Sequence, residues 1–95
     1  MAIDLSLDMS ISREEFLRLL PAAVGMPSLQ EVDGVFTGGD AVCGWSLRLV
    51  PLPDRSLGRV VLPRHRVDLH FKGYSGEERE AFLARFHRGF LRGGG

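Results

Sequence analysis

Hydrophobic and polar residues alternate over two segments of the chain. In residues 3–9 the odd positions are apolar and the even positions are polar, and residues 66–72 repeat the pattern with Val67, Leu69 and Phe71 as the apolar set. A period of two is typical of a strand that buries one of its faces. The sequence therefore predicts a strand over each segment, with a polar face turned to water.

A helical segment follows the first of these strands. Ser12 and Glu15 form a capping box, which predicts the start of a helix, and the apolar residues after it recur at helical spacing. Pro21 has no N–H group to donate inside a helix. We therefore expect the first helix to end or to kink near Leu20.

A second helical segment follows the second alternating strand. Ser75 and Glu78 form another capping box, and three phenylalanines then recur every four residues. They are Phe82, Phe86 and Phe90. Because this spacing places their rings on one face, we expect them to anchor the helix on the sheet. Arg92 followed by a glycine predicts the end of this helix.

Turn signals separate β-like runs in the middle of the chain. "VDGV" and the pair Gly38-Gly39 predict turns, and residues 43–49 predict a strand whose apolar side chains share one face. Residues 50–58 carry two prolines and predict a loop. After this loop, "RVVL" predicts a short strand that Pro63 interrupts.

The order of elements is β-α-β-β-β(-β)-α, which indicates an α+β fold. Each helix follows its strand closely and must turn back over the sheet, while the alternating polar residues predict an opposite face open to water. We expect a mostly antiparallel sheet of four to five strands with two helices on one face. Residues 1–92 form the single expected domain, and residues 93–95 form an expected flexible glycine tail.

The polar face of the predicted sheet gathers the densest set of polar and ionisable side chains. The set is Asp4, Ser6, Asp8, Arg48, Arg66, Asp68, His70 and Lys72. Acids on one strand and bases on another are typical of cross-strand pairs. The catalytic alternative makes His70 a proton-transfer group, but no nucleophile motif accompanies it. We therefore favour a face without catalysis and keep a small enzyme as an alternative.

Neither a metal nor a cofactor is expected. His65 and His70 are five residues apart on a predicted strand and so face opposite sides. Cys43 is the single cysteine of the chain, which gives neither an internal disulfide nor a paired thiol site.

The charge differs between the two halves of the chain, although the net charge is zero. Residues 1–54 carry eight acids and three bases, and residues 55–95 carry four acids and nine bases, which gives −5 and +5. The basic half includes a stripe on the second helix, formed by Arg85, Arg88 and Arg92. Binding of nucleic acid or another anion is therefore an alternative, but the halves can equally attract each other within the fold or between subunits.

The chain ends in "FLRGGG", which resembles the C-termini of ubiquitin and the small sulfur-carrier proteins. The resemblance implies a carrier whose last glycine is activated. It covers about five residues and departs from the pattern in having three glycines instead of two, and the order of elements does not fit the β-grasp fold of those carriers. A carrier remains an alternative, and we favour a helix end with glycine as its cap.

Taken together, these patterns predict a non-catalytic binding module or accessory subunit, with a protein partner or a second copy of the chain. The contact surface would be the polar sheet face, an exposed strand edge or the proline-bearing segment 50–57. No membrane contact is expected, because no apolar run approaches the ~20 residues that span a bilayer. Because the start shows no signal-peptide pattern, we expect a cytoplasmic location, and the arginine-rich composition fits GC-rich coding in a bacterium.

Overall fold

The computed structural model describes residues 3–26, 29–40 and 42–94, with side chains as far as Phe90. Its elements are β1 (Leu5–Met9), α1 (Arg13–Val24), β2 (Glu31–Val32), β3 (Val35–Gly39), β4 (Gly44–Leu57), β5 (Val60–Lys72) and α2 (Gly76–Gly94). The predicted order of strands and helices is confirmed, with the optional fifth strand present. Helix α2 continues through Gly93 and Gly94, so the prediction that it ends at Arg92 is wrong. Gly95 lies outside the described residues.

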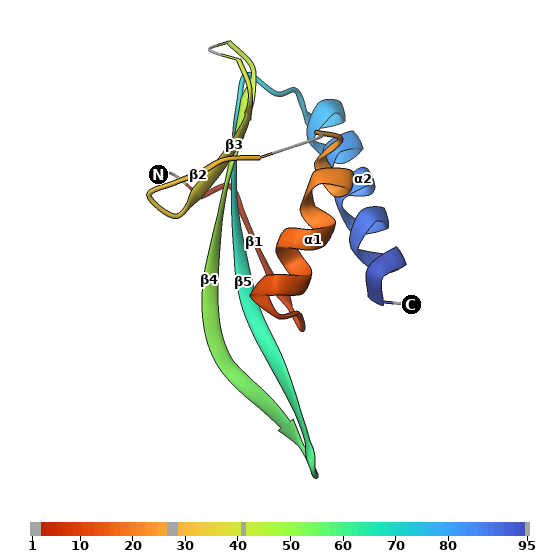
Figure 1. Ribbon diagram of the computed structural model, residues 1–95. Helices are drawn as coiled ribbons and strands as arrows, with labels where there is room; N and C mark the ends of the chain where they lie inside the picture. The colour runs from red at the N-terminus through yellow and green to blue at the C-terminus, as the bar shows by residue number, and fades with distance from the viewer. Residues whose placement is uncertain (1–2, 27–28, 41, 95) are drawn as a thin grey trace.

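The five strands form one antiparallel sheet in the order β1-β5-β4-β3-β2. Both helices lie against one face of this sheet and leave the other face open (Figure 1). The expected α+β architecture is therefore confirmed. The first strand lies beside the last one, so residues from both ends of the sequence meet on the open face.

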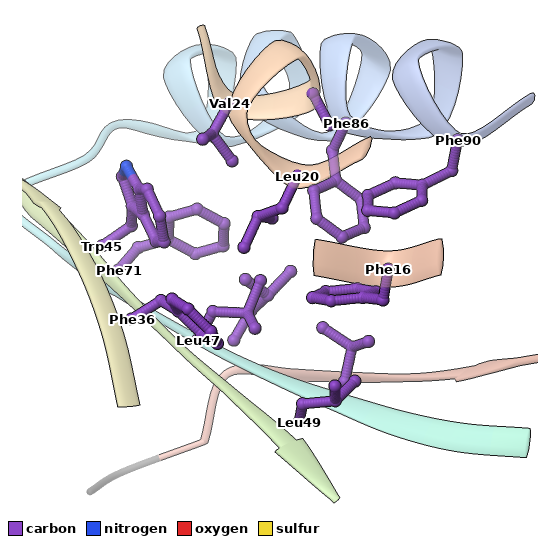
Figure 2. Packing of buried hydrophobic residues seen from close by; sticks show 13 residues of the cluster. Phe16, Leu20, Val24, Phe36, Trp45, Leu47, Leu49, Phe71, Phe86 and Phe90 are labelled. Atoms are coloured by element: carbon purple, nitrogen blue, oxygen red, sulfur yellow. The ribbon is translucent and has the colours of Figure 1, made fainter. Parts of the chain in front are cut away.

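The core lies between the helices and the sheet, as Figure 2 shows. Phe16 of α1 stacks on Phe90 of α2 with their ring centroids 4.9 Å apart, and Phe90 also contacts Phe86, at 4.7 Å. The sheet contributes the apolar sets of β4 and β5, which are Trp45, Leu47, Leu49, Val67, Leu69 and Phe71. The alternation of both strands and the phenylalanine face of α2 are therefore as predicted.

Helix α1 continues through Pro21 to Val24, so the prediction that it ends near Leu20 is wrong. Losing one backbone hydrogen bond at Pro21 costs less here than unwinding would, because Ala23 and Val24 after it are buried in the core. The helix stops at Gly25, whose backbone is left-handed (φ 71°). The N–H groups of Gly25 and Met26 donate to the carbonyls of Ala22 and Pro21, which is the Schellman arrangement.

The two helices approach each other closely at one glycine. A Cβ atom added at Gly89 of α2 would lie 2.6 Å from the Cα atom of Ala23 in α1. Such a separation is far inside van der Waals contact, so only glycine fits at this crossing. Gly89 therefore fixes how near α2 can lie to α1.

The turn before β4 lies later than predicted, because Gly38 and Gly39 belong to β3. In the turn between β3 and β4, the Asp40 carboxylate accepts hydrogen bonds from the N–H groups of Val42 and Cys43. Gly38 lies opposite Trp45, and a Cβ atom at Gly38 would lie 2.4 Å from the Trp45 indole nitrogen. The glycine serves packing here, since it gives the indole ring room to lie on β3.

The β4–β5 hairpin is longer than the rest of the sheet. Beyond Arg48 strand β4 has no partner in β3, and before His65 strand β5 has no partner in β1. The hairpin extends past the helices as a bent ribbon, which we call the arm and define as residues 52–64 (Figure 1). The prediction of a loop over residues 50–58 is wrong, and so is the prediction that Pro63 interrupts the next strand.

The arm tolerates prolines because neither of its outer edges pairs with another described strand. A proline that points its missing N–H toward water removes no ladder bond. Pro53 and Asp54 of β4 oppose the single residue Pro63 of β5, and this β-bulge accompanies the bend. Gly58, with φ 61°, opens the two-residue turn at the tip.

Candidate functional site

The open face of the sheet brings most of the predicted polar set together around Asp68. Asp68 lies on β5 between Ser6 of β1 and Arg48 of β4. Its carboxylate accepts a hydrogen bond from the Ser6 hydroxyl at 2.7 Å and two from the Arg66 guanidinium at 3.0 and 3.1 Å. Although no helix covers this face, only 2 % of Asp68 is exposed. Neighbouring side chains therefore bury the carboxylate.

The pKa of Asp68 reflects two opposing effects. Burial raises the pKa, and the hydrogen bonds from Arg66 and Ser6, with the nearby Arg48 charge, lower it. The sum is a lowered pKa, so the carboxylate is charged at neutral pH. The charged Asp68 thus ties the edge strand β1 to β5 through Ser6 and lies beside the Arg48 charge of β4.

A second polar group lies where β5 meets the residue before β1. Asp4 accepts hydrogen bonds from the Phe71 backbone N–H at 2.8 Å and from His70 Nδ1 at 3.0 Å, and Arg79 lies 3.9 Å away. The Phe71 N–H is the largest cause that lowers the pKa of Asp4, against a smaller effect of burial. Asp4 therefore ties the start of the chain to β5.

The arrangement of His70 does not complete a catalytic relay. An imidazole held by a carboxylate can act as a general base when a nucleophile is within reach of its other nitrogen. Ser46 of β4 lies directly opposite His70, but the hydrogen bond of the imidazole is to Asp4, and Ser6 donates its hydroxyl to Asp68. The geometry of these side chains is that of cross-strand pairing.

The last members of the polar set lie near the base of the arm and at the far end of β5. Asp8 pairs with Arg64, which also lowers the pKa of the Asp8 carboxyl through its hydrogen bond. Lys72 lies exposed at the end of β5, opposite Gly44. His65 lies on the other face of β5 from His70, and its Nδ1 donates to the Ile11 carbonyl at 2.7 Å. The two histidines therefore lie on opposite faces of β5, as predicted.

In the basic stripe on α2, the position of Arg85 has a structural explanation. The Arg85 guanidinium lies against Gly25, at the C-terminal end of α1. A cation there complements the helix dipole, and the last turn of α1 contains no base of its own. Arg88 lies with Arg85 beside a shallow groove between the helices. The side chain of Arg92 lies outside the described residues.

The arm carries a surface that the sequence predicted only in part, because segment 50–57 was expected as a contact surface but in the form of a loop. Leu57, Val60 and Val61 lie at its tip and are exposed by 57, 54 and 59 %. Leu57 lies opposite Val60 and Arg55 lies opposite Leu62, and these four residues share one face of the arm. We call them the tip face. The signal in the sequence was "SLGRV", a glycine-led two-residue turn between apolar residues.

Neither a metal site nor a membrane-spanning helix adds a further candidate site among the described residues. In residues 3–26, 29–40 and 42–94, no three His, Cys, Asp or Glu side chains gather as a metal site. None of the helices described is long and apolar enough to cross a membrane. No protein-family model, curated protein or solved structure matches the chain. Its own geometry is therefore the basis for assigning a function.

Proposed function

We propose that this protein is a non-catalytic binding module and that the arm is the element with which it contacts a protein partner. The observation that carries the proposal is the exposure of three large aliphatic side chains, Leu57, Val60 and Val61, at the tip of a ribbon outside the core. Aliphatic side chains gain free energy when a partner removes them from water. A protruding hairpin can present them without disturbing the fold.

The arm contributes nothing to the hydrophobic core. The buried apolar residues of β4 and β5 end at Leu49 and begin at Val67, so the ribbon beyond them packs on neither helix. Selection for stability alone gives no reason to keep such a ribbon. Contact with a partner gives one, because hydrophobic residues exposed together mark interaction sites.

The open face of the sheet supports the proposal by its chemistry. The described buried polar side chains all have hydrogen-bond partners. The carboxylates of Asp4, Asp8 and Asp68 are already hydrogen-bonded within this face, so a ligand that binds them must first break those bonds. This favours the arm over the polar face as the contact element.

The test is a variant that lacks the arm but keeps the body. Leu52 and Arg64 are paired across the hairpin, so Asn-Gly can replace residues 53–63 as a two-residue turn between them. Because the core is untouched, we expect the variant to melt within a few degrees of the wild type. We also expect it to lose proteins that the tagged wild type retains from lysate of its source organism.

The readout is the difference among three captured sets of proteins, from the wild type, the shortened arm and a point variant. Mass spectrometry of the eluates should show at least one protein that depends on the arm and that also disappears with the point variant Leu57→Ser/Val60→Ser. Identical sets from wild type, shortened arm and point variant would overturn the proposal. A nucleic acid retained only by the wild type would instead favour the anion-binding alternative.

The proposal includes a cytoplasmic location in a bacterium. The single half-buried cysteine, which leaves no internal disulfide, supports it. Fractionation of source cells with an antibody against the protein tests the location, and recovery in the membrane or exported fraction would contradict it.

A further inference from the structure

We propose that the partner of the arm is a second copy of this chain, and that the tip face of each copy docks in the groove between α1 and the β2–β3 edge of the other. This inference rests on the proposed function, because it takes the arm as the contact element. It adds the identity of the partner and the place where the arm binds.

The groove has an apolar floor and an acidic rim. Its volume is about 270 Å³, and it is lined by Leu17, Leu20, Pro21, Leu29, Glu31 and Phe36. Leu20 and Phe36 are buried at its floor, while the side chains around them are half-exposed or exposed. Apolar grooves of this kind accept aliphatic side chains, which displace water from the floor. The tip face presents such side chains.

The charges of the tip and the groove are opposite. Arg55 and Arg59 at the tip form no ion pair with a described residue. Glu31 lies on the rim of the groove, and Glu14 of α1 lies one helical turn before Leu17, so both acids face the groove region. Glu31 already forms a 2.6 Å ion pair with Arg13. Glu14 is exposed and can contact the arm. Charge complementarity therefore orients the arm on the groove.

The small net charge of the arm favours a protein groove over a polyanion. Of its bases, Arg64 is already paired with Asp8, and Asp54 offsets one of the two that remain, Arg55 and Arg59. A nucleic acid is held mainly by several simultaneous phosphate contacts. One uncompensated charge provides little of that attraction, whereas the aliphatic side chains of the tip face, Leu57, Val60 and Leu62, match an apolar site.

A copy cannot fill its own groove with its own arm. Figure 1 shows the tip at the far end of the molecule from β2, and the molecule measures 47 Å along its longest axis. Two copies related by a two-fold axis bring each arm to the partner's groove. Such an exchange is self-complementary and closes as a dimer, which satisfies both tips at once.

Light scattering after size-exclusion chromatography tests the dimer. We expect a mass of about twice 10.5 kDa at micromolar concentration, falling toward a single chain on dilution. Leu57→Ser/Val60→Ser should weaken the dimer by about tenfold or more, because both side chains dock. Val61→Ser is the matched control, since Val61 lies on the opposite face of the same ribbon, and it should leave the dimer unchanged.

Complementation between two defective copies tests where the arm docks. Glu14→Arg repels the arm while leaving the core intact, and Leu29→Arg blocks the groove directly, provided that its melting curve shows a folded protein. Each defective copy alone should run as a monomer. A groove variant mixed with the tip variant should form a heterodimer, because one intact arm then meets one intact groove.

Chemical cross-linking gives a second readout, which does not depend on a loss of dimer affinity. In a Cys43→Ser background, a Val60→Cys copy mixed with a Glu14→Cys copy should be joined by a short bis-maleimide reagent. A Gly76→Cys copy, with its cysteine at the start of α2, should not be joined to the Val60→Cys copy. Equal cross-linking of both would overturn the docking site.

The outcomes separate this inference from the proposed function. A strict monomer, or a dimer that the tip and groove variants leave intact, overturns the second copy as partner. If arm-dependent capture of another protein persists in that case, the proposed function stands. If capture and dimer are both insensitive to the arm, both fail.

Discussion

Asp68 is a buried carboxylate on a face of the sheet that no helix covers. Its burial arises from its neighbours on three strands, because Ser6, Arg66 and Arg48 surround it. The charge is kept by hydrogen bonds that offset its desolvation. A single residue thus connects the register of β1, β5 and β4.

We predict that Asp68→Asn lowers the free energy of unfolding by about 1–3 kcal/mol at pH 7, because it removes charge-assisted bonds at a buried site. The folded pKa of Asp68 lies below the unfolded value of about 3.9. The stabilisation is therefore full above that pH and is lost as the pH falls through the folded pKa.

Urea unfolding of both proteins between pH 7 and pH 3 measures this effect. The gap between wild type and variant should be constant from pH 7 to about pH 5 and should narrow below about pH 4. Asp8→Asn is the control, because Asp8 is exposed, and its loss should be smaller. A gap that grows on acidification would contradict the assigned pKa direction.

At the scale of elements, the packing of α2 on α1 depends on Gly89. Alanine is favoured over glycine in helices by about 1 kcal/mol. The close approach to Ala23 reverses this preference, because an added methyl group has to push the helices apart. Tertiary contact therefore outweighs local propensity at this position.

We predict that Gly89→Ala destabilises the protein by about 1–3 kcal/mol, as overpacked cores do. Gly76→Ala is the matched control: it lies in the same helix, has no atom within 4 Å of an added Cβ, and should be neutral or stabilising. Thermal unfolding by circular dichroism measures both. A Gly89→Ala protein as stable as the control would show that the helices shift apart at no cost.

Local patterns predicted the elements that local chemistry determines. At the start of α2, the Ser75 and Glu78 side chains each accept a hydrogen bond from the backbone N–H of the other residue. At the start of α1, the Ser12 hydroxyl accepts one from the N–H of Glu15. The continuation of α1 past Pro21 was not predictable from the same reasoning, since it depends on packing against residues distant in sequence. The prolines of the arm led to the wrong prediction of a loop for a related reason. Only the strand order shows that the arm has unpaired edges, where a proline is tolerated.

The candidate site was predictable in part. The period-two pattern placed Asp4, Ser6 and Asp68 on one face, but the strand order that brings Ser6 beside Asp68 is a property of the whole sheet. Segment 50–57 was predicted as a contact surface but as a loop, because a run with two prolines is typical of loops, so the ribbon that presents the tip face was not foreseen. Its exposure becomes visible only when the length of the ribbon is compared with that of the body.

The whole molecule is less compact than its length predicts. Its radius of gyration is 13.7 Å, whereas a compact chain of this length has roughly 12.4 Å. The arm is the element that extends past the helices (Figure 1). An extended shape of this kind suits an exchange of arms, in which most of the contact lies outside either core.

At this scale we predict a weak dependence of dimerisation on salt. Each dock involves few charge pairs, so raising sodium chloride from 50 to 500 mM should weaken the dimer by less than about tenfold. Binding to nucleic acid through many phosphates would lose far more over a narrower range. Analytical ultracentrifugation at several salt concentrations distinguishes the two, and a steep dependence would exclude the proposed dock.

The prolines of the ribbon have a consequence for how the protein behaves when it is concentrated. A hairpin with two free edges is a template for further strands, and exposed valines and leucines next to it favour fibrils. Pro51, Pro53 and Pro63 interrupt the donors along both edges. The three prolines therefore hinder the addition of further strands to the hairpin. A variant that kept the aliphatic tip but replaced these prolines would be prone to form amyloid during expression or storage.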